Sequence, residues 1–327
     1  MERIINAVWI FGKITLCVPA DSLIPVEWKL SKIFRFLTLL VIVVHTYFFL
    51  EGIVLFLDVL TNNPREYVTG SPRFSEQLGF FLQYGAVEGT DFAIRLASLL
   101  CFRDLRILFS LCSQKRDMGV QTRNTLRIVW TIISMFVVIF LVSGYAYALT
   151  LVIVHFKISE GYAAVLIPTS EFGFRAYNFV NVVACTASTS FCWLFLITFS
   201  THLTDWLDNY SARISGMEFK MKSEFMTKTS FLFANGQASG FREEFLLIRK
   251  GYESFGRIGG LYCLALLYQC TLLIIRFLGD VAFPIESYVA FQPGTQFFCY
   301  ILPIGILLIV SLGGFMARGV SAFPVGR

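Results

Sequence analysis

Long apolar segments recur along the chain and limit what it can fold into. They lie at about 34–57, 77–101, 128–154, 177–201, 258–278 and 287–317. Five of the six have uncharged cores long enough, or nearly so, for a helix to cross a hydrocarbon layer of about 30 Å, which takes roughly 20 residues. The chain is 56% hydrophobic and only 15% charged, so a water-facing globular domain would lack polar residues to cover it. We predict an all-α fold, a polytopic membrane helix bundle with six transmembrane helices.

Loops rich in lysine and arginine alternate along the chain with loops that hold few of them. Five precede the first span, six follow the second, eight follow the fourth and two lie in the tail, whereas the other loops hold two, two and one. Cytoplasmic loops retain positive charge, so this imbalance predicts a cytoplasmic N-terminus in a multi-pass membrane protein. G-protein-coupled receptors have the opposite orientation and seven spans, so the predicted topology disfavours that class.

The longest loop lies between the fourth and fifth spans. Apolar residues continue at helical spacing from 201 to about 225, the sequence NGQASG at 235–240 predicts a turn, and 241–258 is again helical in pattern. We therefore expect the fourth and fifth helices to extend into the cytoplasm. The predicted division of the chain is 1–201 for the N-terminus and four spans, 202–257 for an anchor-like cytoplasmic helical loop, and 258–327 for two spans and a short tail.

The span at 77–101 differs from the others because it carries charge. Its polar residues fall on one helical stripe, which holds Gln77, Tyr84, Glu88, Asp91, Arg95 and Ser98. Three unpaired charges facing lipid would cost about 8–10 kcal/mol, so the stripe is expected to face other helices or water. Asp91 and Arg95 stand four residues apart, the spacing at which opposite charges on a helix pair. Two interpretations stay open: a structural ion pair between Asp91 and Arg95, or a hydrated cavity in the outer half of the membrane with Glu88 and Tyr84 on its wall.

Further polar residues fall in the outer halves of neighbouring spans and fit such a cavity. Small-molecule sites usually combine aromatic walls with a few polar groups. The candidate ligand-binding residues are Tyr84, Glu88, Asp91, Tyr147, Thr150, Tyr177, Asn181 and Gln269. Tyrosines near a membrane interface are also common anchors, so a purely structural role stays open for them.

Several chemical functions are disfavoured by what the sequence does not contain. It has no H-E-x-x-H, G-x-S-x-G, P-loop or dinucleotide-binding glycine pattern, so we expect neither an enzyme nor a cofactor. The eight cysteines show no C-x-x-C pair or ligand spacing, and we expect no metal site and no disulfide among them. The topology accounts for the basic residues, so nucleic acid is not an expected partner.

Two stretches carry a resemblance to a known family. Residues 11–22, FGKITLCVPADS, precede the first span, and residues 242–270, REEFLLIRKGYESFGRIGGLYCLALLYQC, lead into the fifth. With the cytoplasmic N-terminus and the long helical loop, they resemble the gustatory receptors of the insect-type chemoreceptor superfamily. The resemblance implies a ligand-gated, non-selective cation channel of four like or unlike subunits. It also implies a pocket for a small-molecule tastant or odorant in the outer half of each subunit and a cytoplasmic anchor of extended helices.

The resemblance also implies a seventh helix, which lines the pore and carries a Thr-Tyr…Gln-Phe signature. The residues after 317 show neither that signature nor another span, and we expect the chain to be truncated before the pore helix. Two alternatives stay open. One is a six-helix solute transporter that uses Glu88, Asp91 and Arg95 for coupling, and the other is a non-conducting membrane protein.

Overall fold

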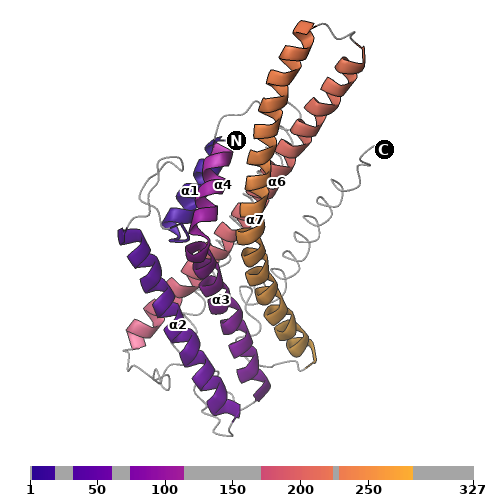
Figure 1. The fold of residues 1–327 in the computed structure, drawn as a ribbon. Coiled ribbons are helices and arrows are strands. Elements are labelled where there is room, and N and C mark those ends of the chain that lie inside the picture. The colour runs from indigo at the N-terminus through magenta and orange to yellow at the C-terminus, as the bar shows by residue number, and fades with distance from the viewer. Residues whose placement is uncertain (1, 19–31, 61–73, 114–170, 224–227, 283–327) are drawn as a thin grey trace.

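The computed structural model describes residues 2–18, 32–60, 74–113, 171–223 and 228–282 (Figure 1). These residues form six helices and no strand, which confirms an all-helical fold for this part of the chain. The helices are α1 (Glu2–Ile14), α2 (Lys32–Leu60), α3 (Phe74–Leu100), α4 (Phe102–Ser113), α6 (Glu171–Ser223) and α7 (Lys228–Ala282). The spans predicted at 128–154 and 287–317 lie outside the described residues.

Two long helices dominate the shape of the molecule. α6 has 53 residues and α7 has 55, more than twice the roughly 20 residues that cross a bilayer. They cross near the middle of the molecule and project side by side beyond the other helices (Figure 1). We call residues 202–223 of α6 and 228–257 of α7 the stalk. Within the described part, two stretches are apolar and long enough to cross a membrane, Val183–Ser215 and Gly240–Ile275.

The predicted turn at 235–240 is wrong, because α7 begins at Lys228 and stays helical through this stretch. Glycine and asparagine lower intrinsic helix propensity by up to about 1 kcal/mol each, and tertiary packing can override that preference. Here packing against α6 begins directly afterwards. The ring of Tyr210 lies 5.9 Å from that of Phe241 and 6.0 Å from that of Phe245, measured between centroids.

Two short helices, α1 and α4, pack beside the base of the stalk (Figure 1). Neither was predicted as an element, because both are too short to cross a membrane and the sequence was divided by membrane-spanning length. α1 is nevertheless part of the core: Ile5, Val8 and Trp9 are fully buried. These positions follow the i, i+3, i+4 spacing of a helix with one apolar face.

A cluster of aromatic rings joins α1, α4, α6 and α7. The Phe109 ring of α4 lies 4.8 Å from both Trp9 and Phe199, in edge-to-face geometry. Phe195 continues the cluster, 4.6 Å from Phe199 and 5.2 Å from Tyr262 of α7. Edge-to-face pairs of this kind add about 0.5–1.5 kcal/mol each beyond the burial of their surface. The cluster therefore fixes α1 and α4 to the two long helices.

Two glycines on α3 allow α7 to approach closely. The Tyr268 hydroxyl of α7 donates a hydrogen bond to the Gly85 carbonyl oxygen at 3.2 Å. One turn along, a Cβ atom added to Gly89 would lie 2.8 Å from the Tyr268 ring, whereas one added to Gly85 would stay 3.7 Å from the hydroxyl. A side chain at position 89 would therefore displace the Tyr268 ring, whereas one at position 85 would make an ordinary van der Waals contact.

Candidate functional site

The charged stripe of α3 lies inside the helix bundle. Glu88, Asp91 and Arg95 are 1%, 0% and 2% exposed, respectively. This burial agrees with the prediction that the stripe faces other helices. Taking a charge out of water is costly unless the charge is paired and hydrogen-bonded, so the partners of these groups determine what the site can do.

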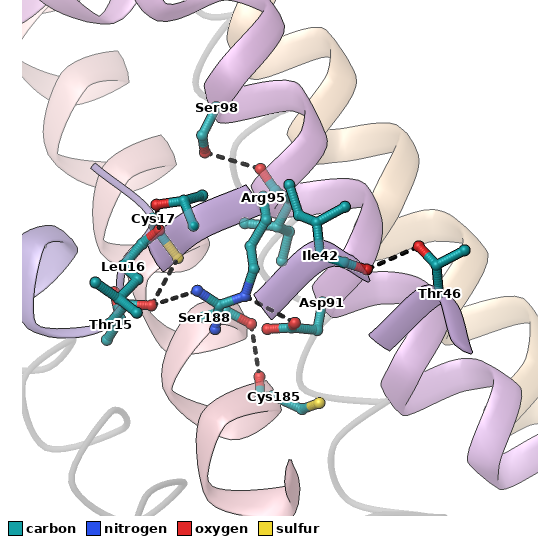
Figure 2. Close-up of polar contacts among 12 residues, drawn as sticks. Thr15, Leu16, Cys17, Ile42, Thr46, Asp91, Arg95, Ser98, Cys185 and Ser188 are labelled. Carbon is teal, nitrogen blue, oxygen red and sulfur yellow. Dashed lines mark hydrogen bonds and ion pairs between the residues drawn. The ribbon is translucent and has the colours of Figure 1, made fainter. Parts of the chain in front are cut away.

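Arg95 forms the predicted ion pair with Asp91 and also holds a second helix. Its Nε donates a hydrogen bond to Asp91 Oδ2 at 2.8 Å. Its Nη1 donates to the carbonyl oxygen of Thr15, just past the last residue of α1, as Figure 2 shows. Hydrogen bonds from a charged group are roughly twice as strong as neutral ones. One guanidinium therefore joins a carboxylate on its own helix to the carbonyl end of α1.

A second side chain binds the same end of α1. Thr38 of α2, which is fully buried, donates its hydroxyl hydrogen to the Leu16 carbonyl oxygen at 3.2 Å. Thr15 and Leu16 follow the last residue of α1, so side chains from α3 and α2 bind the carbonyl groups of the turn that ends this helix. Leu16 has a positive φ of 57°. Such a left-handed conformation costs a non-glycine residue about 1–2 kcal/mol.

α6 forms a further wall of this site. A Cβ atom added to Gly12 would lie 2.5 Å from the Phe191 ring, so the end of α1 packs against α6 with no room for a side chain there. Figure 2 shows Cys185 and Ser188 of α6 beside the Asp91–Arg95 pair. The Ser188 hydroxyl is directed to its own helix, donating to the Cys185 carbonyl oxygen at 3.0 Å. Helices α1, α2, α3 and α6 thus meet around one buried guanidinium.

The polar stripe continues towards α7. Ser98 and Tyr262 share a hydrogen bond of 2.7 Å between their hydroxyl oxygens, and both residues are fully buried. Gln269 of α7 is 2% exposed, and its Oε1 accepts no hydrogen bond from the part of the chain that the structure describes. A buried amide oxygen without a donor is costly, so Gln269 remains a candidate for contact with a ligand.

The structure describes three of the eight candidate ligand-binding side chains. Glu88, Asp91 and Gln269 are buried in the bundle. Three further positions lie on described helices, although their side chains lie outside the description: Tyr84 on α3, and Tyr177 and Asn181 on α6. Tyr147 and Thr150 lie outside the described residues altogether. The ligand-site prediction for these five side chains stays a prediction.

Sequence reasoning missed the residues that receive or complete the Arg95 contact. Thr15 precedes Arg95 by 80 positions, and Leu16 precedes Thr38 by 22. No local pattern marks such pairs. The one available signal was the helical spacing of Ile5, Val8 and Trp9, which indicates that α1 buries one face.

The charges at this site lie close together on one helix. The stripe holds two carboxylates and one guanidinium, spread over about two turns of α3. Among the described residues, no group of three or more His, Cys, Asp or Glu side chains could hold a metal ion. The arrangement can hold helix ends and accept hydrogen bonds from a donor-rich molecule.

No protein-family model matches the chain, and no curated protein matches it. Any function assigned to the chain therefore rests on its own residues and on the geometry around Arg95.

Proposed function

We propose that the chain is a gustatory-receptor-like chemoreceptor, a subunit of a ligand-gated, non-selective cation channel that senses a small molecule. It is a multi-pass protein of the plasma membrane with a cytoplasmic N-terminus, and it assembles as a homo- or heterotetramer. The observation that carries the proposal is the charged cluster of Glu88, Asp91 and Arg95, buried in an apolar helix bundle whose two longest helices continue as a stalk.

The surface of the bundle supports insertion in a membrane. Large apolar side chains are exposed along α2 and α7, among them Phe36 at 65%, Val43 at 62%, Leu264 at 64% and Leu278 at 57%. A soluble monomer rarely exposes so much apolar surface, whereas lipid or a neighbouring subunit would cover it.

The distribution of charge supports the proposed orientation. Among the residues whose side chains the structure describes, the exposed basic ones belong to α1, the start of α2, α4 and the stalk, which lie towards one end of the molecule (Figure 1). They are Arg3, Lys32, Arg35, Arg103, Arg106, Arg213, Arg242, Arg249, Lys250 and Arg257. Because positive charge is retained on the cytoplasmic side, this end is the cytoplasmic one.

The stalk supports a role as a cytoplasmic anchor. Glu244 of α7 accepts hydrogen bonds from Trp206 Nε1 at 2.9 Å and from Arg213 Nη2, both of α6. The Arg213 guanidinium also lies 5.7 Å from the centroid of the Phe241 ring. These contacts hold the two helices of the stalk together with polar and aromatic groups, as a cytoplasmic assembly element requires.

Electrical recording tests the proposal. The product of the complete native transcript, so that any segment beyond Arg327 is included, is expressed in cells and exposed to sucrose, tyramine and quinine, three chemically distinct probes. We expect a cation current with at least one probe. Glu88→Gln should shift its dose dependence, while the matched control Glu253→Gln should not, because Glu253 is 50% exposed in the stalk and pairs only with exposed Arg249.

Two other outcomes would overturn the channel proposal. Saturable uptake of a labelled probe, altered by Glu88→Gln and unaccompanied by channel current, would identify a transporter. Surface expression with neither current nor uptake for any probe would identify a non-conducting membrane protein.

A further inference from the structure

The turn that ends α1 adopts a conformation that its sequence disfavours. The Cys17 N–H donates to the Gly12 carbonyl oxygen at 2.8 Å and the Leu16 N–H to the Lys13 carbonyl oxygen at 3.0 Å. This pair of bonds is the Schellman motif, in which the left-handed residue is usually glycine. Here that residue is Leu16, with a φ of 57°. Such a turn is strained and persists where surrounding contacts hold it.

Two donors from other helices hold this turn. Arg95 of α3 binds the Thr15 carbonyl oxygen, and Thr38 of α2 binds the Leu16 carbonyl oxygen. Both donor side chains are buried; the Arg95 bond is buried as well, and the Thr38 bond is partly buried. The strained residue and the residue before it are thus each fixed from outside α1.

Asp91 determines how Arg95 is presented to α1. A guanidinium carries its donors in one rigid plane, so the bond from Nε to Asp91 Oδ2 orients the Nη1 donor that reaches Thr15. The two side chains stand one helical turn apart on α3. A change in the charge or position of the Asp91 carboxylate therefore reaches α1 through Arg95.

We propose that residues 2–18 form a docked N-terminal segment that opens as one unit, and that the Asp91–Arg95 pair controls the opening. Opening releases the strain at Leu16 and uncovers Trp9, which is fully buried when the segment is docked. Proteins open locally in units whose free energies range from near zero to that of global unfolding. The strain at Leu16 lowers the free energy of opening this segment below the value that the burial of its apolar face alone would set. The inference does not depend on the proposed channel activity, because it concerns the bundle alone.

Hydrogen exchange of backbone amides, followed by mass spectrometry, tests the inference on the whole chain in detergent micelles. Asp91→Asn keeps an acceptor oxygen but removes the charge that orients Arg95. We expect it to speed exchange of the amides of α1 about 10-fold or more, the range for loss of a charge-assisted bond. Thr38→Val removes a neutral bond and should speed the same amides about 2- to 10-fold. Peptides from 190–206 of α6 should not change.

Two further variants separate docking from general stability. Ser98→Ala is the matched control, because it removes a buried hydroxyl bond from α3 to Tyr262 of α7 and none to α1. Exchange of the α1 amides should stay as in the wild type. Leu16→Gly relieves the left-handed strain and should slow that exchange several-fold, as well as offsetting part of the Asp91→Asn effect.

Several results would overturn the inference. Equal acceleration in α1, α3, α6 and α7 of the Asp91→Asn variant would mean that the pair holds the whole bundle and that residues 2–18 are no separate unit. Unchanged α1 exchange in the Thr38→Val variant, or faster exchange in Leu16→Gly, would mean that the turn is neither held nor strained as proposed. The Thr38→Val and Leu16→Gly variants test whether the turn is held and strained even if Asp91→Asn fails to fold.

Discussion

Replacing Arg95 by Met and Asp91 by Asn, singly and together, tests how the buried charges depend on each other. The two side chains are 2% and 0% exposed, and Arg95 Nε lies 2.8 Å from Asp91 Oδ2. Breaking a buried pair by removing one partner costs about 3–5 kcal/mol, because the remaining charge is left uncompensated. Arg95→Met also deprives the Thr15 carbonyl oxygen of its donor, which adds about 1–3 kcal/mol.

The double variant avoids most of this cost. With Asn at 91 and Met at 95, neither member of the pair carries a charge, and the chief remaining loss is the donor to Thr15. We therefore expect the double variant to be more stable than the sum of the single effects predicts, by about 2–3 kcal/mol, at the upper end of coupling energies between contacting residues.

The free energies come from unfolding of the purified chain in mixed micelles with increasing sodium dodecyl sulfate, followed by tryptophan fluorescence and circular dichroism. Ser98→Ala with Arg95→Met provides a comparison pair, since Ser98 bonds to Tyr262 and not to Arg95. Additivity within about 0.5 kcal/mol for Asp91 and Arg95 would refute the reasoning, because residues that do not interact behave in that way.

Three other predictions concern the packing of α7 and the entry of α1 into the core. Gly89→Ala should lower the midpoint of thermal unfolding in micelles, because overpacking against Tyr268 costs about 1–3 kcal/mol. Gly85→Ala should leave the midpoint unchanged or raise it, since alanine is favoured over glycine in a helix by about 1 kcal/mol. Equal shifts in the two variants would contradict this account. Trp206→Phe should destabilise the stalk by about 1.5–3 kcal/mol, because the indole N–H bonds to a carboxylate; the check is faster proteolysis within the stalk at unchanged cleavage elsewhere. Trp9→Ala should cost about 3–5 kcal/mol in the same thermal assay, as a large ring is removed from a fully buried site, and a loss below 1 kcal/mol would show that α1 is not part of the core.

Local patterns accounted for most of the helical content and for part of the site. Length and apolar character predicted helices at α2, at α3 and in the apolar parts of α6 and α7, and helical spacing predicted that the two long helices extend beyond 201 and before 258. The four-residue spacing of Asp91 and Arg95 predicted their ion pair. The helices and the ion pair were predictable because helical periodicity and i, i+4 pairing depend on residues within a few turns of each other.

The partners of the charged stripe could not be obtained in this way. Arg95 bonds to Thr15, 80 positions away, and Thr38 bonds to Leu16, 22 positions away. The left-handed Leu16 and the helical stretch at 235–240 even contradict local preference, since glycine suits the first position and a turn suits the second. Which helices meet, and what strain their contacts sustain, follows from the packing of surfaces that are distant in the chain. The spacing of charges on α3 predicted that they face other helices. Only the packing of the bundle places the end of α1 where Arg95 binds it.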